Sequence, residues 1–186
     1  MKTFKKALTA VITLSLMASI AGCSKQPLDS VSSKTFVKGL KAADSSYEDL
    51  LVEYDEDEIP SLVSTYEDDD IIYAATSHDD TVYFCYFQFD SEKAAKKYFE
   101  DYLGSWQELI EDENFDGDQK NTISDDNGYF IFDGSCDDTD FADGDVYGGV
   151  YWNGDVVIEA LSTSTKGKNV DKVTAFLDEV GYPYCK

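Results

Sequence analysis

Thr81-Val-Tyr-Phe-Cys-Tyr-Phe-Gln-Phe89 is the stretch that decides the fold, because aromatic and β-branched residues fill both of its faces. Side chains alternate between the two faces of a strand, so this pattern predicts a central strand with an apolar layer on each side. Asp90 and Ser91 then provide capping side chains for a helix. Apolar residues recur at steps of three and four as far as Trp106, which predicts a helix that ends near Asp112.

The chain around this strand predicts an α+β fold in which helices pack on an antiparallel sheet. Ile71–Thr76 precedes it as the first strand of a β-hairpin. Further elements are expected over residues 122–123 and 129–132 (strands), 146–152 and 156–163 (a hairpin around Asn153-Gly154) and 170–180 (a helix). Hairpin and helix thus recur in the same order, with Tyr73 falling on Tyr147 after a shift of 74 residues. An internal duplication of a hairpin-helix unit explains this recurrence, and so does chance similarity between two amphipathic units.

Residues 34–66 carry a weaker pattern. Apolar residues at helical spacing predict a helix from Lys34 to an interruption at Ser45-Ser46. The same spacing continues over residues 47–54 and again over residues 59–66. Short strands are the alternative for this region.

The first 22 residues predict a signal peptide. A basic start is followed by residues 7–22, which lack charge but are too short and too rich in Thr and Ser for a transmembrane helix of about 20 apolar residues. The segment ends in Ile20-Ala21-Gly22-Cys23, and small residues directly before a cysteine resemble the lipobox of bacterial lipoproteins. In that family the cysteine receives a diacylglyceryl group and becomes the new N-terminus. A secreted protein in which Cys23 is coincidental is the alternative.

The lipobox resemblance implies a protein anchored on the extracytoplasmic face of the cell membrane, with the bilayer as its partner through acylated Cys23. Each buried methylene contributes about 0.8 kcal/mol, so two or more acyl chains anchor a protein stably. Residues 1–22 are then a lipoprotein signal peptide, residues 23–33 the lipidated cysteine and a serine-rich flexible tether, and residues 34–186 a single domain.

The composition is strongly acidic. The formal net charge is -23 at pH 7, and removing residues 1–22 deletes three lysines and no acid, which changes it to -26. Such a surface repels phosphate groups, so nucleic acid is excluded as a partner. The 13 tyrosines and 11 phenylalanines supply enough apolar surface for a folded core, which argues against disorder.

Three cysteines, Cys85, Cys136 and Cys185, remain if Cys23 carries lipid. On the oxidising side of a membrane we expect one disulfide and one free thiol. Cys136 with Cys185 is one candidate pair, but spacing alone does not choose among the pairings.

An acidic segment after the predicted helix is the candidate metal site. With Asp112 at position one, Asn114 and Asp116 match the first half of an EF-hand calcium loop, and Asp118 adds a carboxylate. Position twelve is Ile123, where an EF-hand has a bidentate Glu, and a strand is expected to follow. A calcium site and a solvated acidic loop are the two interpretations.

Tyr147, Tyr151 and Trp152 are the candidate ligand-binding residues. They lie beside the Asn153-Gly154 turn, where exposed rings would offer a flat surface to a sugar or peptide. Packing in the core or across strands is the alternative use of these rings.

The sequence lacks the common catalytic signatures. It contains no Walker loop, HExxH or Gly-x-Ser-x-Gly motif, and its only histidine, His78, is expected in a hairpin turn. No catalytic residue is predicted, and a non-catalytic role is favoured. The 38 acidic residues leave one enzymatic alternative, in which a pair of carboxylates acts at the envelope.

Phe87-Gln88-Phe89-Asp90-Ser91, followed by Ala94, Tyr98 and Phe99, resembles small uncharacterised lipoproteins of Gram-positive gut and soil bacteria. The resemblance covers a minor part of the chain and transfers no catalytic or binding residue. It implies a lipid-anchored extracytoplasmic α+β domain. We therefore expect a binding or interaction module at the cell envelope, with a protein, peptide or glycan as its partner.

Overall fold

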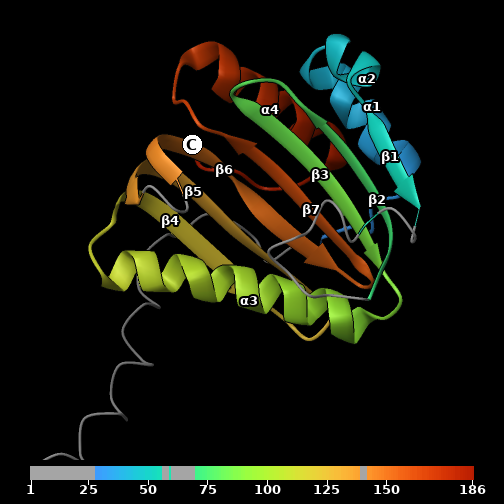
Figure 1. Ribbon diagram of the computed structural model, residues 1–186, viewed down its shortest axis with the longest axis horizontal. Helices are drawn as coiled ribbons and strands as arrows, with labels where there is room; N and C mark the ends of the chain where they lie inside the picture. The colour runs from blue at the N-terminus through green and yellow to red at the C-terminus, as the bar shows by residue number, and fades with distance from the viewer. Residues whose placement is uncertain (1–27, 56–58, 60–69, 139–141) are drawn as a thin grey trace, which may run out of the picture.

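The computed structural model describes residues 28–55, 59, 70–138 and 142–186. Within these residues seven strands form one antiparallel sheet in the order β1-β2-β3-β7-β6-β5-β4, and helices cover both of its faces (Figure 1). The predicted α+β class is therefore confirmed. The strands are β1 (Val52–Asp55), β2 (Ile71–His78), β3 (Val82–Phe89), β4 (Phe115–Ile123), β5 (Asn127–Asp138), β6 (Ala142–Asn153) and β7 (Val156–Ser162), and the helices are α1 (Ser33–Ala43), α2 (Ser46–Asp49), α3 (Glu92–Glu111) and α4 (Gly167–Val180). None of the helices in this part of the chain is long and apolar enough to cross a membrane.

β3 and α3 form as the decisive segment predicts. β3 lies between β2 and β7, and its side chains enter two apolar layers. Phe84 stacks on Phe176 of α4, whereas Phe87 packs against Tyr98 of α3 on the other face. Ser91 caps α3 by accepting a hydrogen bond from the backbone N–H group three residues later (3.2 Å).

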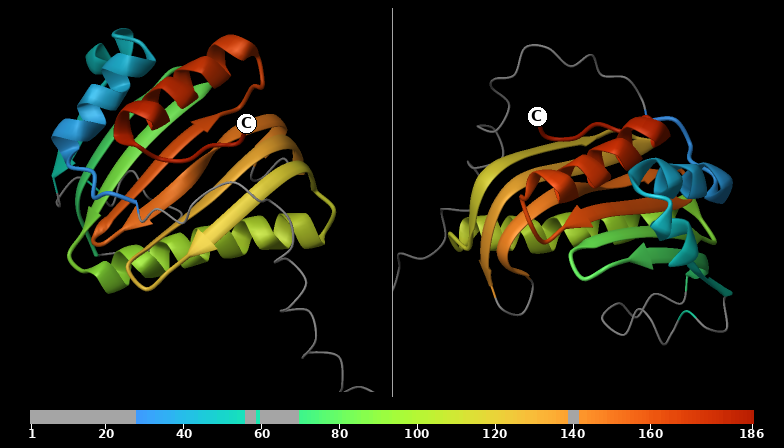
Figure 2. Two further views of the ribbon diagram at one scale, coloured as in Figure 1. Left: turned by 180° about the vertical axis from the view of Figure 1, so that it is seen from behind. Right: turned by 90° about the horizontal axis from the view of Figure 1, so that it is seen from above.

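Figure 2 shows α3 on one face of the sheet and α1 and α4 side by side on the other. The helices of the two hairpin-helix units, β2-β3-α3 and β6-β7-α4, therefore pack on opposite faces. β3 and β7 are adjacent and antiparallel, so a twofold axis that superimposes one hairpin on the other is perpendicular to the sheet. Rotation about such an axis does not exchange the two faces of the sheet, so a repeated unit would have both helices on one face. The order of elements recurs as predicted, but the connection from hairpin to helix has the opposite handedness in the two units, so no rotation superimposes one unit on the other.

The helix prediction over residues 47–54 is wrong. α2 is one short turn, and β1 follows it as an edge strand paired with β2, in agreement with the alternative of short strands. Residues 59–66 lie outside the described residues except for Ile59, which is buried. β4 extends well before the predicted residues 122–123, because most of its side chains are exposed on an edge strand and leave no alternating apolar pattern.

Both ends of the described chain meet on the face that carries α1 and α4. Leu28 is buried, although the sequence assigns residues 23–33 to a flexible tether, and the side-chain amide of Asn153 donates to its carbonyl oxygen. The hydroxyl of Tyr182 donates to the carbonyl oxygen of Asp29 (3.1 Å). Leu28 and Asp29 are therefore part of the packed domain.

Candidate functional site

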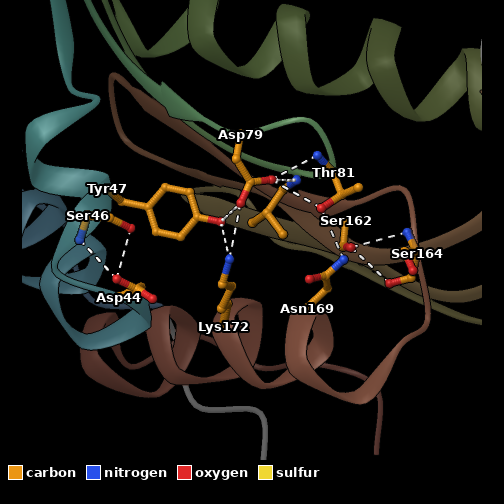
Figure 3. Close-up of polar contacts among 10 residues, drawn as sticks. Asp44, Ser46, Tyr47, Asp79, Thr81, Ser162, Ser164, Asn169 and Lys172 are labelled. Atoms are coloured by element: carbon orange, nitrogen blue, oxygen red, sulfur yellow. Dashed lines mark hydrogen bonds and ion pairs between the residues drawn. The ribbon is translucent and has the colours of Figure 1, made fainter.

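A polar cluster joins the turn between β2 and β3 to α2 and α4 (Figure 3). Asp79 lies at its centre. Its Oδ1 accepts hydrogen bonds from the backbone N–H groups of Thr81 (2.8 Å) and Val82 (2.9 Å) and from the Thr81 hydroxyl (3.1 Å). A carboxylate that accepts bonds from the following residues fixes the turn. The other oxygen, Oδ2, is thereby directed toward the two helices.

Asp79 Oδ2 receives hydrogen bonds from both helices. The hydroxyl of Tyr47 in α2 donates at 2.5 Å, and Lys172 Nζ in α4 donates at 3.1 Å. Lys172 also donates to the Tyr47 oxygen (2.9 Å), and its ammonium lies 4.9 Å from the centre of the Tyr47 ring. We call Tyr47, Asp79 and Lys172 the Asp79 cluster, because each of the three contacts the other two.

The Asp79 cluster keeps its charge states around neutral pH. Burial opposes ionisation of Asp79, but hydrogen bonds from Tyr47, Lys172 and the turn outweigh it and hold the pKa of the carboxyl well below its usual range. Burial and the bond to Asp79 raise the pKa of Tyr47 to about 12. The bond to Tyr47 raises the pKa of the Lys172 ammonium. None of these groups is poised to exchange a proton near neutral pH, so the cluster positions elements rather than performing acid-base chemistry.

We expect Asp79→Ala to lower the free energy of unfolding by about 3 kcal/mol, because two helix side chains and two turn N–H groups lose their acceptor. Lys172→Met should cost about 1 kcal/mol, since its ammonium is partly solvated. Urea denaturation at neutral pH measures both values. Because the pKa of Asp79 is depressed in the folded state, its contribution is present above about pH 4 and is lost as the pH falls further.

The neighbouring variant Asp80→Ala is the matched control for this prediction. Its side chain is exposed, so we expect a change within about 0.5 kcal/mol. A loss for Asp79→Ala no larger than that of Asp80→Ala would contradict the role of the Asp79 cluster in joining the turn to the helices.

Glu159 of β7 is a second unusual group, and it lies beneath α3. Its exposed fraction is 9%, and its Oε1 accepts a hydrogen bond from the hydroxyl of Tyr98 in α3 at 2.9 Å. In the register of β3 and β7 it lies opposite Cys85. Burial raises the pKa of Glu159 to about 7, against the lowering effect of the bond from Tyr98. A carboxyl that titrates near neutral pH is chemically suited to proton transfer.

The segment of the candidate calcium loop returns to the sheet as a strand. Asp112 is the C-cap of α3, Asn114 follows it, and Asp116 and Asp118 lie in β4. Phe115 packs edge-on against Trp106, which directs the chain into β4 rather than around an ion. An EF-hand needs ligands wrapped around one point, whereas an extended strand spreads them apart. In the described ranges no group of three or more His, Cys, Asp or Glu side chains is placed to hold a metal.

The three candidate ligand-binding rings, Tyr147, Tyr151 and Trp152, are buried, in agreement with the alternative of packing in the core. Tyr147 and Tyr151 lie on the face that carries α1 and α4, and Trp152 lies on the α3 face. The hydroxyls of Tyr147 and Tyr151 donate to the carbonyl oxygens of Cys185 (2.9 Å) and Pro183 (2.7 Å). Alternation along β6 separates the rings, and two of them hold the C-terminal segment of the same chain.

The three cysteines do not pair with one another. Cys85 and Cys136 share the α3 face, but β7 and β6 separate their strands, so the two residues lie at least about 14 Å apart. A disulfide needs Cα atoms within about 7 Å. Cys185 is half-buried on the opposite face. The candidate pair of Cys136 with Cys185 is therefore wrong.

Sequence reasoning missed both polar sites. Asp79 and Lys172 are 93 residues apart, and local patterns give no sign of such a contact. Glu159 did leave a signal, because it is the one charged residue within the apolar strand Val156–Ser162. Comparisons with protein families, curated proteins and solved structures found no match to this chain.

Proposed function

We propose that the chain is a lipid-anchored extracytoplasmic lipoprotein whose folded domain is a non-catalytic binding or interaction module at the cell envelope. The observation that carries this proposal is Ile20-Ala21-Gly22-Cys23, which follows a basic start and an uncharged segment. Acyl chains on Cys23 would hold the domain at the bilayer. Its partner is then a protein, peptide or glycan of the envelope.

Packing of the chain soon after Cys23 supports a role close to the membrane. Leu28 is buried in the domain, and four residues separate it from Cys23 in the sequence. An extended chain spans at most about 3.6 Å per residue, so Leu28 stays within about 18 Å of the lipidated residue. The anchored domain therefore works beside the bilayer surface.

The chemistry of the two polar sites supports binding over catalysis. The Asp79 cluster satisfies its own charges, and its groups keep their charge states near neutral pH. Glu159 is the observation that favours the alternative, an envelope enzyme with an acidic pair. However, its hydrogen bond comes from a tyrosine and its cross-strand neighbours are Cys85 and Val150, so a second carboxylate is not supplied by these contacts. A hydrolytic activity that disappears in Glu159→Gln without loss of fold would favour the enzyme.

Expression of the full chain in a bacterial host tests the anchor. We expect the wild-type protein to enter the detergent-rich phase of a cloud-point detergent and to incorporate a labelled fatty acid, because acyl chains are apolar. Cys23→Ala should lose the label and stay in the aqueous phase. Cys185→Ser removes a thiol elsewhere and should behave as the wild type. Equal partitioning of the wild type and Cys23→Ala would contradict the proposal.

A further inference from the structure

α1 is an amphipathic helix whose outer face carries only positive charge. Phe36 and Leu40 are buried, whereas Lys34, Lys38 and Lys41 are exposed. At about 100° per residue the three lysines fall within an arc of roughly 60°, on the side opposite the buried residues. Of the described elements, α1 is the one that contains lysine and no acidic residue.

The lysines of α1 are less neutralised than those of the other long helices. In α3, for example, Lys96 has Glu100 one turn further along the helix (3.9 Å). In α1, Lys41 pairs with Glu48 (2.9 Å). Lys34 and Lys38, two further α1 lysines, have no carboxylate within ion-pair distance in the part of the chain that the structure describes.

α1 also lies near the proposed anchor in the sequence and in space. It begins at Ser33, shortly after Leu28, which stays within about 18 Å of Cys23. The acidic residues nearest to it in sequence, Asp29 and Asp44, precede and follow the helix rather than interrupt its lysine face. With a net charge of -23 for the whole chain, most of the surface repels anionic headgroups, and α1 is the local exception.

We propose that the outer face of α1 docks on anionic lipid headgroups beside the acyl anchor and so sets the orientation of the domain on the membrane. This inference rests on the proposed acylation of Cys23. A lipid anchor and a basic patch together hold a protein more firmly than either alone. The sheet order places β4 at the edge farthest from β1, and Figure 1 shows α1 beside the β1 end. Docking through α1 therefore directs the edge strand β4 away from the bilayer, toward partners in the envelope.

Fluorescence quenching on vesicles tests the orientation. The mature acylated protein with Ala42→Cys and Cys185→Ser is labelled at position 42, which is exposed beside the lysine face, and is reconstituted with headgroup-spin-labelled lipid. We expect strong quenching on vesicles of phosphatidylcholine with phosphatidylglycerol and weak quenching on phosphatidylcholine alone. Lys34→Gln, Lys38→Gln and Lys41→Gln together should lower the ratio of docked to undocked domain by as much as roughly a hundredfold. High salt should also weaken the docking, because it screens exposed charges.

The matched control removes the same charge from α3 through Lys93→Gln, Lys96→Gln and Lys97→Gln and should preserve the quenching. Equal losses in the α1 and α3 variants would overturn the inference, because total charge rather than α1 would then set the position. Equal quenching of the wild type on neutral and anionic vesicles would overturn it as well. Flotation of the same samples separates the two proposals, since failure to float with the vesicles overturns the anchor itself.

Discussion

Gly148→Ala should lower the free energy of unfolding by more than about 4 kcal/mol, which is a large share of the roughly 5–15 kcal/mol that stabilises a single domain. Gly148 lies in β6 at a φ of 140°, which L residues rarely adopt. A Cβ atom at this position would lie 2.0 Å from the carbonyl oxygen of Ala160 and 2.9 Å from the Cα atom of Leu161. Both atoms belong to the backbone of β7, so relief requires the two central strands to separate.

A second glycine of the same strand provides the control for Gly148→Ala. Gly144 also has a positive φ of 109°, but a Cβ atom there meets nothing within 4 Å. Gly144→Ala should therefore cost about 1 to 2 kcal/mol, from backbone strain alone. Urea denaturation followed by circular dichroism measures both variants. Similar losses in the two would show that β6 and β7 do not approach as closely as described.

Glu159→Gln should stabilise the domain by about 2 kcal/mol at about pH 8.5 and have little effect near pH 4.5. The pKa of Glu159 is raised from 4.5 to about 7 in the folded state, so folding favours its protonated form. Its contribution is complete below the unfolded pKa and is lost as the pH rises through about 7. A pKa shift of this size corresponds to about 3 kcal/mol of stability. The amide N–H₂ group of the new glutamine lacks a partner when buried, and the cost of burying it reduces the expected gain to about 2 kcal/mol.

Thermal unfolding as a function of pH checks this prediction. The difference in stability between Glu159→Gln and the wild type reports the contribution of Glu159 alone, because the other acidic residues are the same in both proteins. Glu108→Gln on α3 changes the same charge at an exposed position and should give no pH-dependent difference. Tyr98→Phe removes the hydrogen bond that lowers the pKa of Glu159 and should move the transition to higher pH. The difference in the free energy of unfolding between the wild type and Glu159→Gln should change from pH 4.5 to about 8.5. A constant difference would contradict the raised pKa of Glu159 in the folded state.

The elements that could be predicted from the sequence are those with strong periodicity. Thr81–Phe89 and the helix after Ser91 place apolar residues in patterns that only one structure satisfies, and both form. Residues 47–54 failed because tyrosines and leucines three or four positions apart suit a helix and also a turn followed by a strand. β4 was underestimated because an exposed edge strand has no buried face to mark it.

The surroundings of the candidate site residues could not be predicted for a different reason, which is that tertiary packing decides them. An EF-hand pattern specifies which residue types could bind calcium, but the packing of Phe115 against Trp106 determines the path of the chain. Tyr151 and Trp152 are neighbours in the sequence, yet a strand directs them to opposite faces. The contact between Asp79 and Lys172 depends on where α4 crosses the sheet, which no local pattern specifies.

The position of β7 determines the order in which this domain is able to fold. β7 is the last strand in the chain but the middle strand of the sheet, so β2-β3 and β4-β5-β6 stay two fragments with open inner edges until it arrives. α1, the first helix, likewise waits for α4, the last. Synthesis delivers the N-terminus first. A chain built in this way keeps its sheet incomplete during synthesis and closes cooperatively once residues 156–186 have emerged.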